Sequence, residues 1–118
     1  MSTKFYIKDG IPTINPEDVN ELSNFEIIDV RRLEEFTAEL GHIESAKLVT
    51  LGPDLKNFIN KTEKTKQLIF VCRSGGRSGQ ATQDALSAGF SEVYNMDGGM
   101  LKWNALKLPV WREFKIQE

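Results

Sequence analysis

The only cysteine of this 118-residue chain, Cys72, is followed directly by residue types that bind anions. Glycines permit backbone conformations with positive φ, so successive amide N–H groups can converge on one anionic centre. Arginine guanidinium groups suit an oxyanion, and serine hydroxyls add donors. The segment indicates either a nucleophilic cysteine over an anion cradle or a buried cysteine that only packs. The cradle residues are Arg73, Ser74, Gly75, Gly76, Arg77 and Ser78.

The sequence on both sides of Cys72 favours the nucleophile. Residues 68–71, LIFV, form an uninterrupted apolar run that is typical of a strand at the centre of a parallel sheet. Residues 77–88 suit a helix with Ala81, Ala85 and Ala88 on one face. A thiolate between them faces unpaired amide hydrogens and the positive end of the helix dipole. A purely structural turn has no need of so many anion-binding groups.

Strands and helices are predicted to alternate along the chain. Apolar, β-branched segments predict strands at residues 25–30, 45–51, 66–72 and 92–96. Capping residues and amphipathic spacing predict helices at residues 15–22, 32–40, 52–62, 77–88 and 100–107. This order predicts an α/β fold with a mainly parallel sheet of about five strands and right-handed crossovers. In such sheets the carboxyl ends of the strands carry the ligands.

A second group of polar residues follows the strand at residues 25–30. Asp29 and Arg31 are expected to face the Cys72 loop and support it, with an ordinary ion pair or helix cap favoured over direct catalysis. The sole histidine, His42, would be the natural general base, but its place in the sequence GHI indicates a hydrogen-bonded structural residue. Helical spacing places three further residues in the core: Met100, Trp103 and Leu106.

Length and composition predict one domain over residues 1–118, with a core at about residues 13–110. The net charge of -2 gives no reason to expect nucleic acid or an anionic membrane as partner. No apolar run is long enough to cross a bilayer, and the amino terminus has no signal-like segment. A lone cysteine cannot form an internal disulfide, so we expect a cytoplasmic, reducing setting.

The sequence predicts neither a metal nor a cofactor. No second cysteine or cluster of histidines is present to ligate a metal ion. The segment GGRSG lacks the spacing of a nucleotide-binding P-loop.

Three motifs together resemble the rhodanese sulfurtransferase family in its single-domain form, over roughly residues 13–110. They are IIDVRRLEEFTAELGHIESA at residues 27–46, IFVCRSGGRS at residues 69–78 and VYNMDGGMLKW at residues 93–103. The resemblance implies a three-layer α/β/α fold. Ser45 replaces a glycine that is common in the family, and Val49 and Thr50 replace a common Ile-Pro pair. These departures concern the local chain path more than the chemistry.

The resemblance also implies a mechanism. Cys72 would attack the outer sulfur of a small anionic donor such as thiosulfate and carry the sulfur as a persulfide. Cyanide or a thiol would then remove it, in a ping-pong cycle. Residues 73–78 would form the binding cradle, with Arg73 and Arg77 holding the donor. A partner protein that supplies or accepts the sulfur remains an alternative to small molecules.

Two rival functions stay open. Phosphatases and arsenate reductases related in fold place an arginine after Cys-x5, whereas Arg77 follows Cys72 as Cys-x4-Arg. The shorter loop favours a sulfur-sized centre over a phosphoryl group. The second rival is a non-catalytic binding module or a sulfur carrier of the same fold. The presence of Cys72 with its whole cradle argues against a module that has lost catalysis and leaves the carrier possible.

Overall fold

The computed structural model describes residues 4–113, which form a six-stranded mixed sheet. The strands lie in the order β1-β2-β6-β5-β3-β4. β1 pairs with β2 in the antiparallel sense, and all other neighbours pair in parallel. This confirms the predicted α/β fold with a mainly parallel sheet. The strands are β1 (Phe5–Lys8), β2 (Ile11–Ile14), β3 (Glu26–Asp29), β4 (Lys47–Leu48), β5 (Leu68–Val71) and β6 (Val93–Met96).

The amino-terminal hairpin, formed by β1 and β2, was not predicted from the sequence. Asp9 and Gly10, with φ of 52° and 78°, form the two-residue turn between β1 and β2. The ring of Phe5 in β1 stacks on Tyr94 of β6 at a centroid distance of 3.9 Å. No strand was predicted before residue 15. The segment gives a contradictory signal, because Pro12 lies inside β2 and proline argues against a strand. β2 accommodates Pro12 opposite Ile7 of the edge strand.

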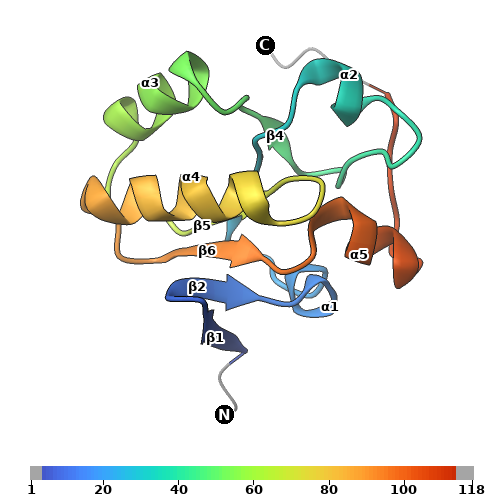
Figure 1. Ribbon diagram of the computed structural model, residues 1–118, viewed down its shortest axis with the longest axis horizontal. Coiled ribbons are helices and arrows are strands. Elements are labelled where there is room, and N and C mark those ends of the chain that lie inside the picture. The colour runs from blue at the N-terminus through green and yellow to red at the C-terminus, as the bar shows by residue number, and fades with distance from the viewer. Residues whose placement is uncertain (1–3, 114–118) are drawn as a thin grey trace.

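Helices cover both faces of the sheet, as the three-layer prediction requires (Figure 1). Residues of α3 and α4 share one hydrophobic cluster, and residues of α1, α2 and α5 share the other. No helix within residues 4–113 is both long and apolar enough to cross a membrane. The helices are α1 (Pro16–Val19), α2 (Leu33–Phe36), α3 (Pro53–Lys61), α4 (Gly76–Ser87) and α5 (Gly99–Ala105).

The central strand β5 holds the two layers together. Leu68 and Phe70 belong to the cluster under α3 and α4, whereas Ile69 and Val71 belong to the opposite cluster. Side chains alternate between the two faces of a strand, so an apolar run packs against both layers. All four residues are fully buried, which confirms the expectation for this segment.

Several elements are shorter than predicted. The first two helices each span four residues, and β4 spans two. The core prediction is confirmed for Met100 and Trp103 but wrong for Leu106, which is 42% exposed. Leu106 lies just past the last residue of α5, so the helical spacing that should bury it no longer applies.

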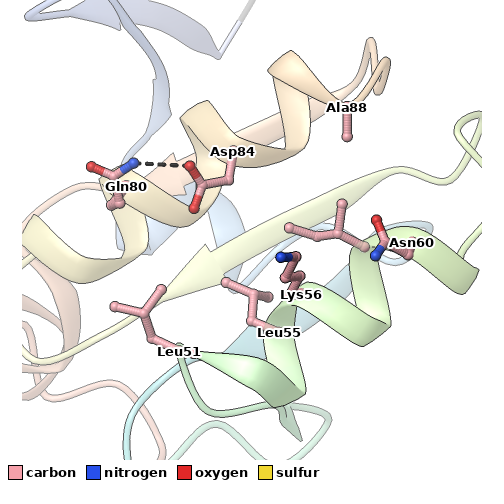
Figure 2. Close-up of a pocket in the computed structure, with 9 residues that line it drawn as sticks. Leu51, Leu55, Lys56, Asn60, Gln80, Asp84 and Ala88 are labelled. Atoms are coloured by element: carbon pink, nitrogen blue, oxygen red, sulfur yellow. Dashed lines mark hydrogen bonds between the residues drawn. The ribbon is translucent and has the colours of Figure 1, made fainter.

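A groove of about 580 Å³ separates α3 from α4 (Figure 2). Leu55 and Ile59 of α3 belong to the buried cluster beneath it, and Lys56 and Asp84 are among its polar residues. Gln80 donates a hydrogen bond to the Asp84 carboxylate at 2.9 Å along one side. Cys72 is not among the residues that line this groove.

Candidate active site

Cys72 lies at the carboxyl end of β5 and is 1% exposed. Its Sγ atom accepts a hydrogen bond from the backbone N–H of Gly75 at 3.0 Å. The Ser78 hydroxyl lies 3.2 Å from the same sulfur. Both donors belong to the loop and first turn of α4, so the sulfur lies at the amino end of a 12-residue helix. This is the arrangement in which an anionic sulfur is stabilised.

The backbone of the loop explains why glycine follows the cysteine. Gly75 has a φ of 109°, which side-chain-bearing residues rarely adopt, and this conformation directs its N–H toward the sulfur. The next amides, those of Gly76 and Arg77, have no hydrogen-bond partner within residues 4–113. Free amide hydrogens at a helix start bind anions, so the loop has donors left for a ligand.

The other end of the loop is held by α5. The amides of Met100 and Leu101 donate to the carbonyl oxygens of Cys72 and Arg73 at 2.9 and 3.0 Å. A Cβ atom on Gly99 would lie 2.5 Å from the Cys72 and Arg73 carbonyl oxygens. Only glycine permits this approach, which explains the second glycine of the closing Gly-Gly motif. The sequence predicted a turn at this Gly-Gly pair but not its close contact with the Cys72 loop.

Arg77 is paired with Glu35, which lies 42 residues earlier in the chain. Its two terminal nitrogens donate to the two carboxylate oxygens at 2.7 and 2.8 Å. These hydrogen bonds are the main reason why the pKa of Glu35 is lowered from 4.5 to about 2. Desolvation acts in the opposite direction and raises this pKa. The ion pair also raises the pKa of Arg77. The five N–H hydrogens of a guanidinium leave three for another anion.

Sequence reasoning missed Glu35 as a partner of this loop. The signal lies in α2, where the Glu35 side chain also accepts the backbone N–H of Arg32 at 3.1 Å. That bond fixes the carboxylate at the start of the short helix, where it can meet Arg77.

The remaining loop residues are open to solvent. Arg73 and Ser74 are exposed, and their side chains make no hydrogen bond or ion pair with the part of the chain that the structure describes. Gly76 is also exposed. The seven predicted loop residues, 72–78, all lie together at the start of α4. Their roles in binding a donor stay a prediction.

Asp29 and Arg31 form a fully buried ion pair beside the loop. The Arg31 guanidinium donates to both Asp29 oxygens, at 3.0 and 2.8 Å, and to the Gly41 carbonyl oxygen at 2.7 Å. The expectation of an ordinary ion pair is confirmed. The pair connects the end of β3 to the turn before His42, and its support of the Cys72 loop stays a prediction.

His42 is a structural residue, as its sequence context indicated. Its Nδ1 atom lies 2.7 Å from the Phe36 carbonyl oxygen, and because a carbonyl only accepts, Nδ1 carries the hydrogen. The ring stacks on Phe36 at a centroid distance of 3.6 Å. Trp111, unassigned from the sequence, forms an isolated antiparallel bridge with His42. Within residues 4–113, no three His, Cys, Asp or Glu side chains gather as a metal site.

Asn95 is a further residue of the site that sequence reasoning missed. Its Oδ1 atom lies 2.5 Å from the Ser78 hydroxyl oxygen, and its Nδ2 donates to the Gly75 carbonyl oxygen at 3.2 Å. Asn95 lies in β6, next to β5, which brings it under the loop. The signal was an amide side chain inside the apolar strand VYNM.

Comparison with known proteins agrees with this geometry. Residues 15–106 match the rhodanese-like domain. Rhodanese-like domain-containing protein 17 of Arabidopsis thaliana is 34% identical, over 88% of this chain and 77% of its own. Thiosulfate sulfurtransferase GlpE of Pseudomonas aeruginosa is 28% identical, over 85% of this chain and 90% of its own.

The fold is also shared with solved structures. A rhodanese-related protein from Thermoplasma volcanium superimposes with a TM-score of 0.76 at 24% identity, covering 86% of this chain and 98% of its own. The matched residues include the whole of the Cys72 loop and the Gly-Gly turn that holds it. The chain belongs to the rhodanese-like domain family.

Proposed function

We propose that this protein is a sulfurtransferase that moves a sulfane sulfur from an anionic donor to a thiophilic acceptor through a persulfide on Cys72. The observation that carries the proposal is the Cys72 sulfur itself. At the amino end of α4 the Gly75 amide donates to it and the Ser78 hydroxyl lies within hydrogen-bond distance, and further loop amides have no partner within residues 4–113. Hydrogen bonds to an anionic sulfur stabilise both the attacking thiolate and a persulfide anion.

The reaction balances without a cofactor. The Cys72 thiolate attacks the outer sulfur of thiosulfate, an S–S bond forms to Cys72, and sulfite leaves with the electron pair of the broken bond. In the second half, cyanide or a thiolate attacks the terminal sulfur, forms a new bond to it and releases the Cys72 thiolate. The negative charge that appears in each half stays within reach of the loop amides.

The residues around the loop favour a small sulfur donor. Because Cys72 is 1% exposed, the attacked atom must fit a narrow approach to the sulfur. A terminal sulfur atom meets this requirement more easily than a tetrahedral phosphorus centre, and the Cys-x4-Arg loop is short for phosphate. The exposed Arg73 and the free donors of Arg77 would hold the anionic part of thiosulfate.

The acceptor and setting are part of the same proposal. A cellular thiol, cyanide or a partner protein would remove the sulfur. A reducing compartment such as the cytoplasm would keep the single free Cys72 in its reactive form.

The test is to incubate the protein with thiosulfate and measure its intact mass. We expect a gain of one sulfur atom, reversed by cyanide with release of thiocyanate and absent in Cys72→Ser. Turnover over a panel of donors and acceptors then ranks thiosulfate against mercaptopyruvate and polysulfide. Hydrolysis of an aryl phosphate without any sulfur uptake would contradict the proposal.

A further inference from the structure

Ser78 stands between two acceptors of a hydrogen bond. Its hydroxyl oxygen lies 3.2 Å from the Cys72 sulfur and 2.5 Å from Oδ1 of Asn95, and the side chain is fully buried. A serine hydroxyl has one proton, so it can donate to only one of these atoms at a time. No second proton is available within the hydroxyl to satisfy both.

The orientation of Asn95 is fixed by its other contact. Its amide lies 3.2 Å from the Gly75 carbonyl oxygen, and a carbonyl can only accept, so the nitrogen must face Gly75. Oδ1 therefore faces Ser78, and this oxygen can also only accept. The Asn95 side chain is buried, so water does not readily replace a donor that its Oδ1 atom has lost.

The state of the sulfur decides where the Ser78 proton goes. When Cys72 carries its own proton, the thiol donates to the Ser78 oxygen and Ser78 donates to Asn95, so every group has a partner. When Cys72 is a thiolate, Ser78 must turn its proton toward the sulfur, and Oδ1 of Asn95 loses its donor. In a persulfide the negative charge lies on the outer sulfur, one atom farther away, and the proton can return to Asn95.

We propose that Asn95 is a positioning residue that competes with Cys72 for the Ser78 proton. The competition makes the free thiolate less stable relative to both the thiol and the persulfide. It therefore biases the site toward the sulfur-loaded form. The first effect concerns Cys72 and Ser78 alone. The second rests on the proposed sulfurtransferase function.

The first experiment follows the pH profile of Cys72 alkylation by iodoacetamide, read by intact mass. The midpoint of the profile reports the thiolate, whereas its plateau reports access to the buried sulfur. In Asn95→Ala we expect the midpoint to fall to lower pH, with alkylation below the midpoint faster by roughly three- to tenfold. Asn95→Leu, which fills the space and has no acceptor, should shift the midpoint in the same direction.

A double variant separates this role from a structural one. If Asn95 acts through the Ser78 proton, Asn95→Ala should not move the midpoint in a Ser78→Ala background. An equal shift in both backgrounds would mean that Asn95 acts through Gly75, and this would overturn the proposal. So would an unchanged or higher midpoint in the single variants. Asn104→Ala is the control, because Asn104 donates to the Leu40 and Met100 carbonyl oxygens.

The second experiment measures the loaded fraction of Cys72 at a fixed ratio of thiosulfate to sulfite. Asn95→Ala should hold less persulfide than the unmodified protein, because its free thiolate is more stable. A loaded fraction that is equal or higher would contradict the bias. If the unmodified protein takes up no sulfur at all, the proposed function fails, and the alkylation profiles still decide the role of Asn95.

Discussion

At the scale of single residues, the proposed chemistry depends on hydrogen-bond donors around one sulfur atom. The Gly75 amide donates to Cys72, the Ser78 hydroxyl lies 3.2 Å from the same sulfur, and Arg77 is held nearby by Glu35. Charged hydrogen bonds of this kind are stronger than neutral ones, so their loss affects a bound anion more than it affects folding. Arg77 is the residue at which the two effects can be separated, because its side chain is 36% exposed.

Arg77→Ala is expected to lower kcat/KM for thiosulfate by roughly ten- to hundredfold, because a charged donor to the anion is lost. The free energy of unfolding should fall by only about 1 kcal/mol, as for a partly exposed ion pair. Steady-state turnover and urea denaturation measure the two effects. Arg32→Ala is a matched control, because Arg32 approaches the same Glu35 at 3.6 Å but lies outside the loop. Unchanged turnover in Arg77→Ala would mean that Arg77 does not bind the donor.

At the scale of elements, the loop is shaped by the helices at its two ends. α4 begins directly after Gly75, and the first amides of α5 bind the carbonyl oxygens of Cys72 and Arg73. The close approach of α5 depends on the missing side chain of Gly99. The position of the sulfur is therefore a joint property of β5, α4 and α5.

Gly99→Ala is expected to reduce the free energy of unfolding by ~2–4 kcal/mol, because the new Cβ would overlap the backbone of Cys72 and Arg73. Persulfide formation should be lost with it, since α5 must move away from the loop. Urea denaturation and intact mass after thiosulfate treatment measure these effects.

Gly10→Ala is the matched control for this prediction. Gly10 also has a positive φ, of 78°, but a Cβ there would meet nothing within 4 Å. Its substitution should cost only about 1–2 kcal/mol, from backbone strain, and leave persulfide formation intact. Equal losses of stability in the two variants would contradict the argument from close approach.

At the scale of the whole molecule, two ion pairs connect distant parts of the chain around the site. The buried pair of Asp29 and Arg31 joins β3 to the turn at Gly41, and Glu35 with Arg77 joins α2 to α4. The second pair makes stability depend on pH, because folding lowers the pKa of Glu35 from 4.5 to about 2. A carboxyl group with a lowered pKa stabilises the folded state above its unfolded pKa, and that contribution is lost as the pH falls through its folded pKa.

The free energy of unfolding should therefore decrease between about pH 5 and pH 2, in part through Glu35. In Glu35→Gln we expect stability at pH 7 to be lower by about 1–2 kcal/mol, after allowance for solvent screening at Arg77, and to decrease less steeply in that window. Urea denaturation at a series of pH values measures this. Glu34→Gln is the control, because Glu34 is 73% exposed. An identical slope in Glu35→Gln would show that the ion pair does not contribute.

The sequence by itself determined the α/β fold and the strand, loop and helix around Cys72. These follow from local patterns: the apolar run of β5, the glycines that permit positive φ and the helix that begins after them. Neighbouring residues determine such patterns, so the patterns can be recognised from the sequence alone. Elements whose signals are short or contradictory, such as β2 with Pro12 and the four-residue helices, were missed or given the wrong length.

Only the tertiary structure decided which distant side chains meet the loop. Glu35 pairs with Arg77 across 42 positions, and Asn95 lies within hydrogen-bond distance of Ser78 across 17 positions. Gly99 approaches the backbone of Cys72 from a separate element. The strand order brings β6 beside β5, and no local pattern encodes that neighbour. The prediction of Cys72 as the nucleophile thus rests on a local property of the sequence, whereas the side chains that meet it from other elements depend on the packing of the sheet.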